Sequence, residues 1–284
     1  MTPLRKVQSI HTGQPASDGA GVRLTRVIGG PGLERFDPFL MLDEFGSDNP
    51  DDYIAGFPAH PHRGFETITY MLEGRMRHED HLGNVGLLEG GGVQWMTAAR
   101  GIIHSEMPQQ EEGVMRGFQL WLNLPGKDKL GKAGYRDIQP ADIPRLQTAA
   151  GVDVVVIAGT FDDGQVQQAG AVQRPHTEPH LFDLRLPAGA RVVPRLPEGH
   201  RVMLYVYEGE VELGGHAEPV RASRLVRLSD QGEVQLHSAT GARVLLIAGK
   251  PLNEPIVQYG PFVMNSREEI EQALRDFRDD RLTA

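Results

Sequence analysis

The sequence predicts an all-β fold of two tandem β-barrel or jelly-roll domains, with one short C-terminal helix. Short runs that alternate apolar and polar residues with a period of two recur along the chain, which is typical of strands with one buried face. The 34 glycines and 20 prolines among 284 residues are spread between these runs, which indicates many tight turns. Many short strands joined by frequent turns favour a sandwich or barrel.

The predicted strands follow one another along the whole chain. In RGFQLWLNLP, residues 116–125, Phe118, Leu120 and Leu122 alternate with Gln119 and Trp121. Further β-rich runs between turn residues are VDVVVIAGTF (152–161), LFDLRLPAG (181–189), VMLYVYEG (202–209), EVQLHS (233–238) and ARVLLIAG (242–249).

One stretch near the C-terminus has helical spacing. Ser266 and Glu269 fit a capping box, and Ile270, Leu274 and Phe277 then fall on one helix face. We expect this helix to pack on the body of the protein. The polar end that follows it, DDRLTA, is expected to fray.

A weak internal echo predicts two similar domains. The same offset, 135 residues, separates Tyr70 from Tyr205 and Gly74 from Gly209, and each pair brackets a Y-x-x-E-G motif. A period of about half the chain suggests two β-domains in tandem. We place the first at residues 1–136 and the second, with the helix, at residues 137–284.

Composition excludes several classes of function. The net charge is -9 and no Lys/Arg-rich block occurs, so a surface that follows nucleic-acid phosphates is not expected. Because the chain has no cysteine, disulfides, thiolate metal sites and cysteine nucleophiles are excluded. The N-terminal MTPLRKVQSI lacks the apolar run of a signal peptide, and no apolar run is long enough to span a membrane. We therefore expect a cytoplasmic protein.

Two short motifs carry the chemistry. In GFPAHPHRGFETITYMLEG, His60 and His62 are two residues apart, so both side chains leave one face of an extended strand. ARGIIHSEMP gives His104 and Glu106 the same spacing. If the two strands meet, three imidazoles and one carboxylate converge, a set that suits Fe, Ni, Mn, Cu or Zn. Each motif alone is as typical of a solvated surface as of a metal site.

Glu66 has the same parity as the paired histidines, and three interpretations remain open for it. It could be a metal ligand, it could orient a ligand imidazole through a hydrogen bond, or a kink at Gly64 could turn it away.

Longer blocks around these motifs resemble the signature of the pirin family, a branch of the cupin superfamily. They are GFPAHPHRGFETITYMLEG, HEDHLGN, GGVQWMTAARGIIHSEMP and GFQLWLNLP, with GKPLNEPIVQYGPFVMNS near the C-terminus. The resemblance implies two cupin domains and one metal, usually iron, in the first. By position it implies that His60, His62, His104 and Glu106 are the ligands, which leaves Glu66 to orient an imidazole.

The remaining histidines are not expected to bind metal. No HxH occurs after residue 150, so the second domain is predicted to be metal-free. His176, His180, His200, His216 and His237 are interpreted as surface or hydrogen-bonding residues. His78 and His81, in RHEDHLG, are expected to be exposed at the end of a strand or in a turn.

The resemblance implies two possible roles. Bacterial pirins are associated with quercetin 2,3-dioxygenase activity, which would make Fe²⁺ the cofactor, a flavonol and O₂ the substrates, and Glu106 the base. Phe57, Phe65, Met96, Ile102 and Met107 could wall a pocket for a flat aromatic ring, or simply form core. The alternatives are a metal-sensing regulator that acts through a protein partner, or a different cupin chemistry. We favour the enzyme, and expect a monomer.

Overall fold

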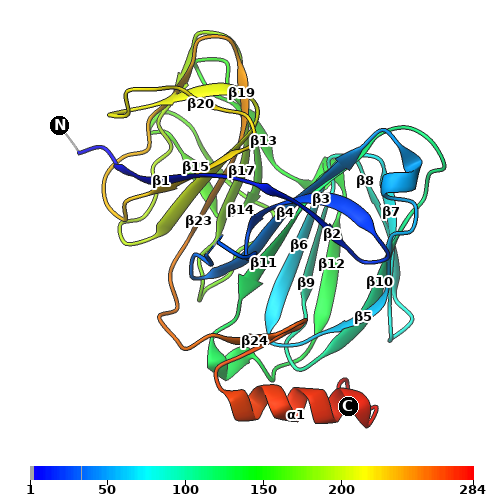
Figure 1. The fold of residues 1–284 in the computed structure, drawn as a ribbon. Helices are drawn as coiled ribbons and strands as arrows, with labels where there is room; N and C mark the ends of the chain where they lie inside the picture. The colour runs from blue at the N-terminus through cyan, green and yellow to red at the C-terminus, as the bar shows by residue number, and fades with distance from the viewer. Residues whose placement is uncertain (1–2, 33) are drawn as a thin grey trace. The chain divides into compact units, whose positions relative to one another are not determined.

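The computed structural model describes residues 3–32 and 34–284 and consists mainly of β-strands (Figure 1). It divides into two compact units. The first unit comprises Gln14–Pro140 and Leu252–Ala284, and the second comprises the chain up to Gly13 together with Ala141–Pro251.

The first unit is built on two antiparallel sheets. The larger has, in spatial order, β12 (Gly134–Ile138), β9 (Val93–Thr97), β6 (Phe65–Glu73), β11 (Met115–Asn123), β4 (Phe39–Ser47), β3 (Val22–Ile28) and β2 (Gln14–Asp18). The smaller has β5 (Phe57–His62), β10 (Ile102–Pro108), β7 (Arg75–Asp80) and β8 (Val85–Glu89). Within the described residues neither sheet closes on itself. Of the two predicted architectures, the unit therefore matches the two-sheet jelly roll and not the closed barrel.

Short elements complete the first unit. They are the hairpin of β24 (Val257–Tyr259) and β25 (Phe262–Met264), the helix α1 (Arg267–Arg278), and the 3-10 turns Pro50–Asp52 and Gly126–Asp128. A third 3-10 turn, Pro140–Asp142, lies where the chain passes from one unit to the other.

The second unit is one branched sheet with a small hairpin. Its main order is β1 (Val7–Thr12), β21 (Arg224–Leu228), β19 (Arg201–Leu213), β23 (Ala242–Gly249), β17 (His180–Leu186), β14 (Asp153–Ala158) and β13 (Arg145–Gln147). The short strands are β18 (Ala190–Val192), β20 (Val220–Arg221) and β22 (Leu236–Ser238), and the hairpin is β15 (Thr160–Asp162) with β16 (Gln167–Ala169). Its core is a continuous cluster of valine, leucine and phenylalanine side chains.

The compact units do not coincide with the predicted division into residues 1–136 and 137–284, because each unit includes one end of the chain. Strand β1 pairs with β21, and Arg5 donates hydrogen bonds to the carbonyls of Pro197, Ser229 and Gly232. The C-terminal helix, predicted to belong to the second domain, belongs to the first unit. The pairing of β1 with β21 and the hydrogen bonds of the buried Arg5 tie the N-terminal segment to the second unit. Both join residues that are far apart in the sequence.

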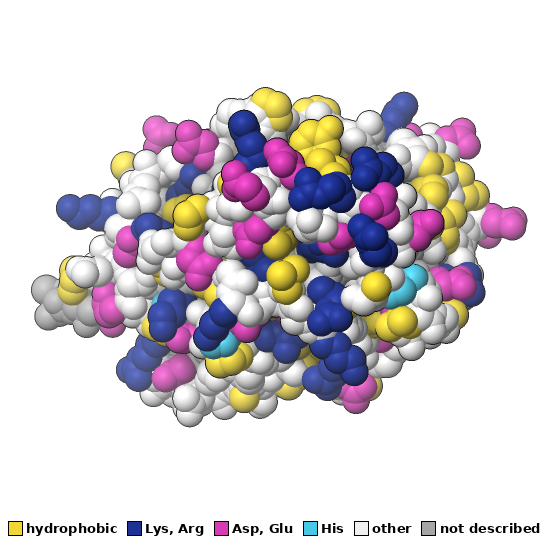
Figure 2. Space-filling model, turned by 90° about the horizontal axis from the view of Figure 1, so that it is seen from below, with side chains coloured by type: hydrophobic (Ala, Val, Ile, Leu, Met, Phe, Trp, Pro, Cys, Tyr) yellow, Lys and Arg dark blue, Asp and Glu magenta, His cyan; other side chains and the backbone are white. Residues whose placement is uncertain are grey.

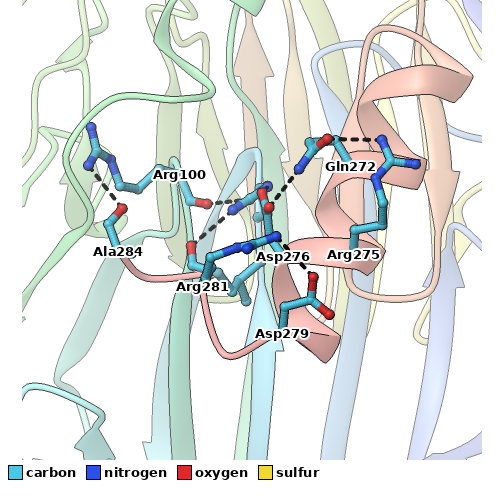
Figure 3. A network of polar contacts seen from close by, with 9 residues as sticks. Arg100, Gln272, Arg275, Asp276, Asp279, Arg281 and Ala284 are labelled. Atoms are coloured by element: carbon cyan, nitrogen blue, oxygen red, sulfur yellow. Dashed lines mark hydrogen bonds and ion pairs between the residues drawn. The ribbon is translucent and has the colours of Figure 1, made fainter.

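The helix begins as predicted, but the tail after it is not frayed. Ser266 and Glu269 form the capping box, and Ile270 is buried, whereas Leu274 and Phe277 are largely exposed. In the tail, Leu282 is 2% exposed and its carbonyl accepts a hydrogen bond from Arg63. Figure 3 shows Arg100 reaching the carbonyl of Ala284. The end of the chain is therefore held by the buried Leu282 and by hydrogen bonds to the carbonyls of Leu282 and Ala284.

Charges of both signs are interspersed on the face drawn in Figure 2. This pattern accords with a net charge of -9 that is not gathered into a single-sign tract. In the part of the chain that the structure describes, no helix combines the length and the apolar character needed to cross a membrane.

Candidate metal centre

Antiparallel pairing of β5 with β10 brings the two histidine motifs together. His60 lies opposite His104 and His62 lies opposite Ile102, with a register shift before Glu106. The imidazole centroids are 4.4 Å apart for His60 and His104, 4.7 Å for His60 and His62, and 5.0 Å for His62 and His104. One nitrogen from each ring lies within 4.8 Å of the others. The three histidine side chains therefore converge, as expected if the two strands meet.

The nitrogens of these rings fit a metal ion. His62 Nδ1 and His104 Nε2 are buried and have no hydrogen-bond partner in the protein. His60 Nδ1 lies 2.8 Å from the carbonyl oxygen of Pro58. Because a carbonyl only accepts, His60 carries its proton on Nδ1 and keeps a lone pair on Nε2. Buried lone pairs without donors suit a cation, since burial of unpaired polar atoms is otherwise unfavourable.

Burial favours the neutral form of two of these histidines, His62 and His104. Desolvation lowers the pKa of His62 well below the usual histidine value, and the charge of His60 acts in the same direction. Desolvation likewise lowers the pKa of His104, helped by its histidine neighbours. A neutral imidazole offers the lone pair that metal binding requires, so the centre is ready for a cation at neutral pH.

Glu106 is buried beside the histidines but is not a member of the three-histidine group. It is two residues from His104 on β10 and so leaves the same face of the strand. Thr69 donates a 3.2 Å hydrogen bond to its Oε1, and Gln119 donates to both oxygens at 3.4 Å. Burial raises the pKa of Glu106, and these donors with the charge of His60 oppose the rise. The carboxylate is thus held at the edge of the centre.

Glu66 lies on the opposite face of β6 from the centre. The ring of Phe65, the preceding residue, contacts His62 with centroids 5.1 Å apart, so strand alternation turns Glu66 the other way. Its Oε1 accepts a 2.6 Å hydrogen bond from Thr97. Parity is lost at Gly64, where φ is +92° and an added Cβ would lie 1.9 Å from a carbonyl oxygen. Glu66 therefore does not orient an imidazole, as the resemblance implied. The structure agrees with the interpretation in which a kink at Gly64 turns its side chain away.

His78 was predicted to be exposed, and that prediction is wrong. The side chain is 1% exposed, and its Nε2 lies 2.6 Å from His104 Nδ1. The signal was in the sequence: in RMRHED, Met76, His78 and Asp80 share one parity while arginine and glutamate occupy the other. The neighbouring His81 is exposed, as expected.

A cavity of about 660 Å³ opens onto His60 and His62. Phe57, Trp121 and Gln119 line it, and so does Pro261 from the C-terminal segment. Of the five apolar residues considered as pocket walls, Phe57 alone is among the lining residues. Phe65, Met96 and Ile102 are fully buried core, and Met107 is half-buried.

The second unit has a more open groove of about 730 Å³ whose lining contains no histidine. Its charged residues are already paired, with Arg185 bound to Asp183 and Arg243 to Glu208. The cavity beside the three histidines is therefore the better candidate site, although the groove is slightly larger.

Two histidines of the second unit are hydrogen-bonded. His200 is buried with its Nε2 3.4 Å from Glu178, and His180 Nδ1 lies 3.0 Å from the carbonyl of the same glutamate. This fits their interpretation as hydrogen-bonding residues, and a metal-free second domain stays a prediction.

Comparison with known proteins places the chain in a family. The family model described as Pirin matches residues 21–122, and the model described as Pirin C-terminal cupin domain matches residues 181–283. A Pseudomonas aeruginosa protein provisionally named quercetin 2,3-dioxygenase is 74% identical over 280 residues, which are 98% of this chain and 98% of that protein.

Solved structures agree with this placement. A crystal structure of quercetin 2,3-dioxygenase from Acinetobacter baumannii is 30% identical, covers 99% of both chains and has a TM-score of 0.87. The bacterial pirin YhhW from Escherichia coli, solved in complex with nickel(II), is 21% identical with a TM-score of 0.66. It covers 88% of this chain and 99% of its own, a likeness that shows the fold alone. Two matched domains and 74% identity along the chain establish that this protein belongs to the pirin family, with two cupin domains.

Proposed function

We propose that this protein is a metal-dependent dioxygenase that opens the heterocycle of flavonols such as quercetin with O₂ and releases carbon monoxide. The observation that carries the proposal is the group of three buried or half-buried histidines beside a cavity large enough for a small molecule. The names of the similar Pseudomonas and Acinetobacter proteins support the reaction class.

His60, His62 and His104 would hold the metal, and Glu106 is proposed as a fourth ligand. Imidazole with carboxylate suits Fe²⁺ first for this chemistry, and also Ni²⁺, Mn²⁺, Cu²⁺ and Zn²⁺. The Escherichia coli relative was solved with nickel(II). When bound, the metal supplies a Lewis acid that stabilises a deprotonated substrate oxygen and a redox-capable centre for O₂.

The cavity walls suit a flat ring system. Phe57, Met41 and Trp121 offer apolar surface, while Gln119 and Arg26 offer polar groups at the same cavity. Apolar walls with a few placed polar groups are typical of small-molecule sites. Flavonols combine fused rings with hydroxyl groups and would meet both kinds of surface.

Glu106 is the proposed base for the substrate hydroxyl. Its raised pKa makes it a better proton acceptor than an exposed glutamate, because base strength rises with the pKa of the conjugate acid. Thr69 and Gln119 fix the orientation of its oxygens. Gln119 also lines the cavity, so the carboxylate lies next to the space that a substrate would occupy.

An aerobic quercetin assay tests the proposal. Iron-loaded protein should bleach the flavonol absorbance and release carbon monoxide in equal amounts, whereas His62→Ala should lose both metal and activity. His81→Gln, a change at an exposed histidine, is the matched control and should behave as wild type. Metal binding without turnover of quercetin would favour the regulatory role, and turnover of unrelated phenols alone would favour a different cupin chemistry. Full metal content and activity in His62→Ala would refute the site.

A further inference from the structure

His78 lies outside the three-histidine group but contacts it directly. Its side chain extends from β7, where it lies opposite Glu106 of β10, and is 1% exposed. Its ring packs between His104 and Tyr135, with centroids 4.8 Å from each. The distance of 2.6 Å between His78 Nε2 and His104 Nδ1 makes a short hydrogen bond.

One proton is shared across this hydrogen bond, and its location decides which nitrogen of His104 can bind a metal. If His104 Nδ1 carries the proton and donates it, His104 Nε2 has a lone pair. If His78 Nε2 carries the proton, neutral His104 must be protonated on Nε2, which then has no lone pair for a cation. Only the first arrangement is competent.

The two arrangements also differ in how they leave buried atoms. His104 Nε2 is buried without a protein partner, so a proton there would be a buried donor with nothing to bind. The contrast with His60 is informative, since its Nδ1 faces the Pro58 carbonyl, which only accepts. His78 can accept or donate, so this contact alone does not fix the tautomer of His104.

We propose that His78 is a positioning residue that accepts the Nδ1 proton of His104 and thereby fixes the ring plane and tautomer in which His104 Nε2 binds the metal. The inference rests on the proposed function only in requiring a metal at the three histidines. Partners of this kind on the outer nitrogen of a ligand histidine contribute to metal affinity. Turnover need not be measured to test it.

Metal affinity separates this role from simple packing. His78→Leu fills the space without an acceptor, whereas His78→Gln retains an oxygen near the position of Nε2. We expect Co²⁺ affinity, measured by competition with a chelator, to fall roughly 10- to 100-fold in His78→Leu. His78→Gln should recover most of it and restore the visible absorption bands of the Co²⁺ protein, and His81→Gln should match wild type. Wild-type affinity in His78→Leu, or equal losses in both variants, would overturn the proposal.

A second measurement needs no variant. Long-range ¹⁵N–¹H spectra of the metal-free wild-type protein report which nitrogen of each histidine is protonated. We expect His104 to carry its proton on Nδ1, and a proton on Nε2 would refute the proposal even if both variants fail to fold. A wild-type protein that binds Co²⁺ tightly but leaves quercetin intact would overturn the dioxygenase function and leave the role of His78 standing.

Discussion

His104 shows how single residues prepare the metal centre. Its Nδ1 is engaged by His78, and its Nε2 is buried without a protein partner. Desolvation holds its pKa well below the usual histidine value, so the ring is neutral at neutral pH. Similar burial prepares His62.

Glu106→Gln should separate metal binding from proton transfer. The amide keeps the shape of the carboxylate and can still accept from Thr69, but it is not a base. We expect most metal to be retained through the three histidines and kcat for quercetin to fall by about 10²- to 10⁴-fold. Metal analysis together with the absorbance assay measures both effects. An unchanged kcat would remove Glu106 from the proposed mechanism.

His180 should make the second unit acid-sensitive. Burial lowers the pKa of His180 from the usual histidine value of 6.5 to about 4. Between these values the unfolded chain binds more protons than the folded one, so the free energy of unfolding falls as pH drops from 6.5 to 4. Below pH 4 this contribution of His180 to the free energy of unfolding is lost. It amounts to about 2 kcal/mol after allowance for the partial exposure of the ring.

Hydrogen exchange of the β17 amides, compared at pH 7 and pH 4.5, measures this effect locally. We expect His180→Gln, which does not titrate, to lose less protection at low pH than wild type. His81→Gln should lose as much as wild type. Identical losses in wild type and His180→Gln would show that another group is responsible.

Alternation along extended chain predicted that His60 and His62 share one strand face, and the family resemblance implied that His104 joins them, as the pairing of β5 with β10 does. It failed for Glu66, because Gly64 breaks the strand and reverses the parity that follows it. The prediction of an exposed strand end or turn is wrong for His78, because the residue lies within β7 on its buried face. The alternation in RMRHED indicates that His78 is buried. The contact between His78 and His104 depends on the pairing of β7 with β10, which the sequence alone does not predict.

At the scale of elements, two buried cations hold the turn between β5 and β6. Lys129 is 1% exposed and donates to Gly64 and Val263 carbonyls and to Asn123. Arg63 binds Asp276 of α1 at 2.7 Å and the Leu282 carbonyl at 2.9 Å. Since Arg63 follows His62 directly, the C-terminal segment stabilises the end of the strand that carries His60 and His62.

Asp276→Ala should weaken both the fold and the centre. The Arg63 side chain is 6% exposed, so loss of its carboxylate partner leaves a buried charge unpaired, at a cost of about 2–3 kcal/mol. We expect a lower thermal midpoint and weaker Co²⁺ binding. Glu271→Ala removes an exposed helix carboxylate whose ion pair spans 4.0 Å and should change little. Equal thermal midpoints in the two variants would show that the ion pair between Arg63 and Asp276 is not needed for stability.

The start of α1 could be predicted because its capping box lies within four residues, Ser266 to Glu269. The packing of the tail could not. DDRLTA looks polar and free, and only the distant Arg63 gives the Leu282 carbonyl a partner. Local signals define where an element begins, while long-range contacts decide whether its end is held.

At the scale of the whole molecule, the internal echo predicted two β-domains and the family resemblance implied that they are cupins, which the two family models support. The sequence does not predict that the N-terminal segment belongs to the second unit and the C-terminal segment to the first. Nothing in the local pattern of β1 or of the C-terminal segment indicates a distant partner. The consequence of this grouping is that residues 252–284 belong to the unit that contains the three-histidine group. Pro261 even lines the cavity at that centre.

The measurement that tests the account most directly is an anomalous difference map from crystals of the full chain grown with iron or nickel. The account predicts one peak per chain, bounded by His60, His62 and His104, with oxygen density towards Glu106. No peak there after loading, or a peak elsewhere with these rings free, would contradict it.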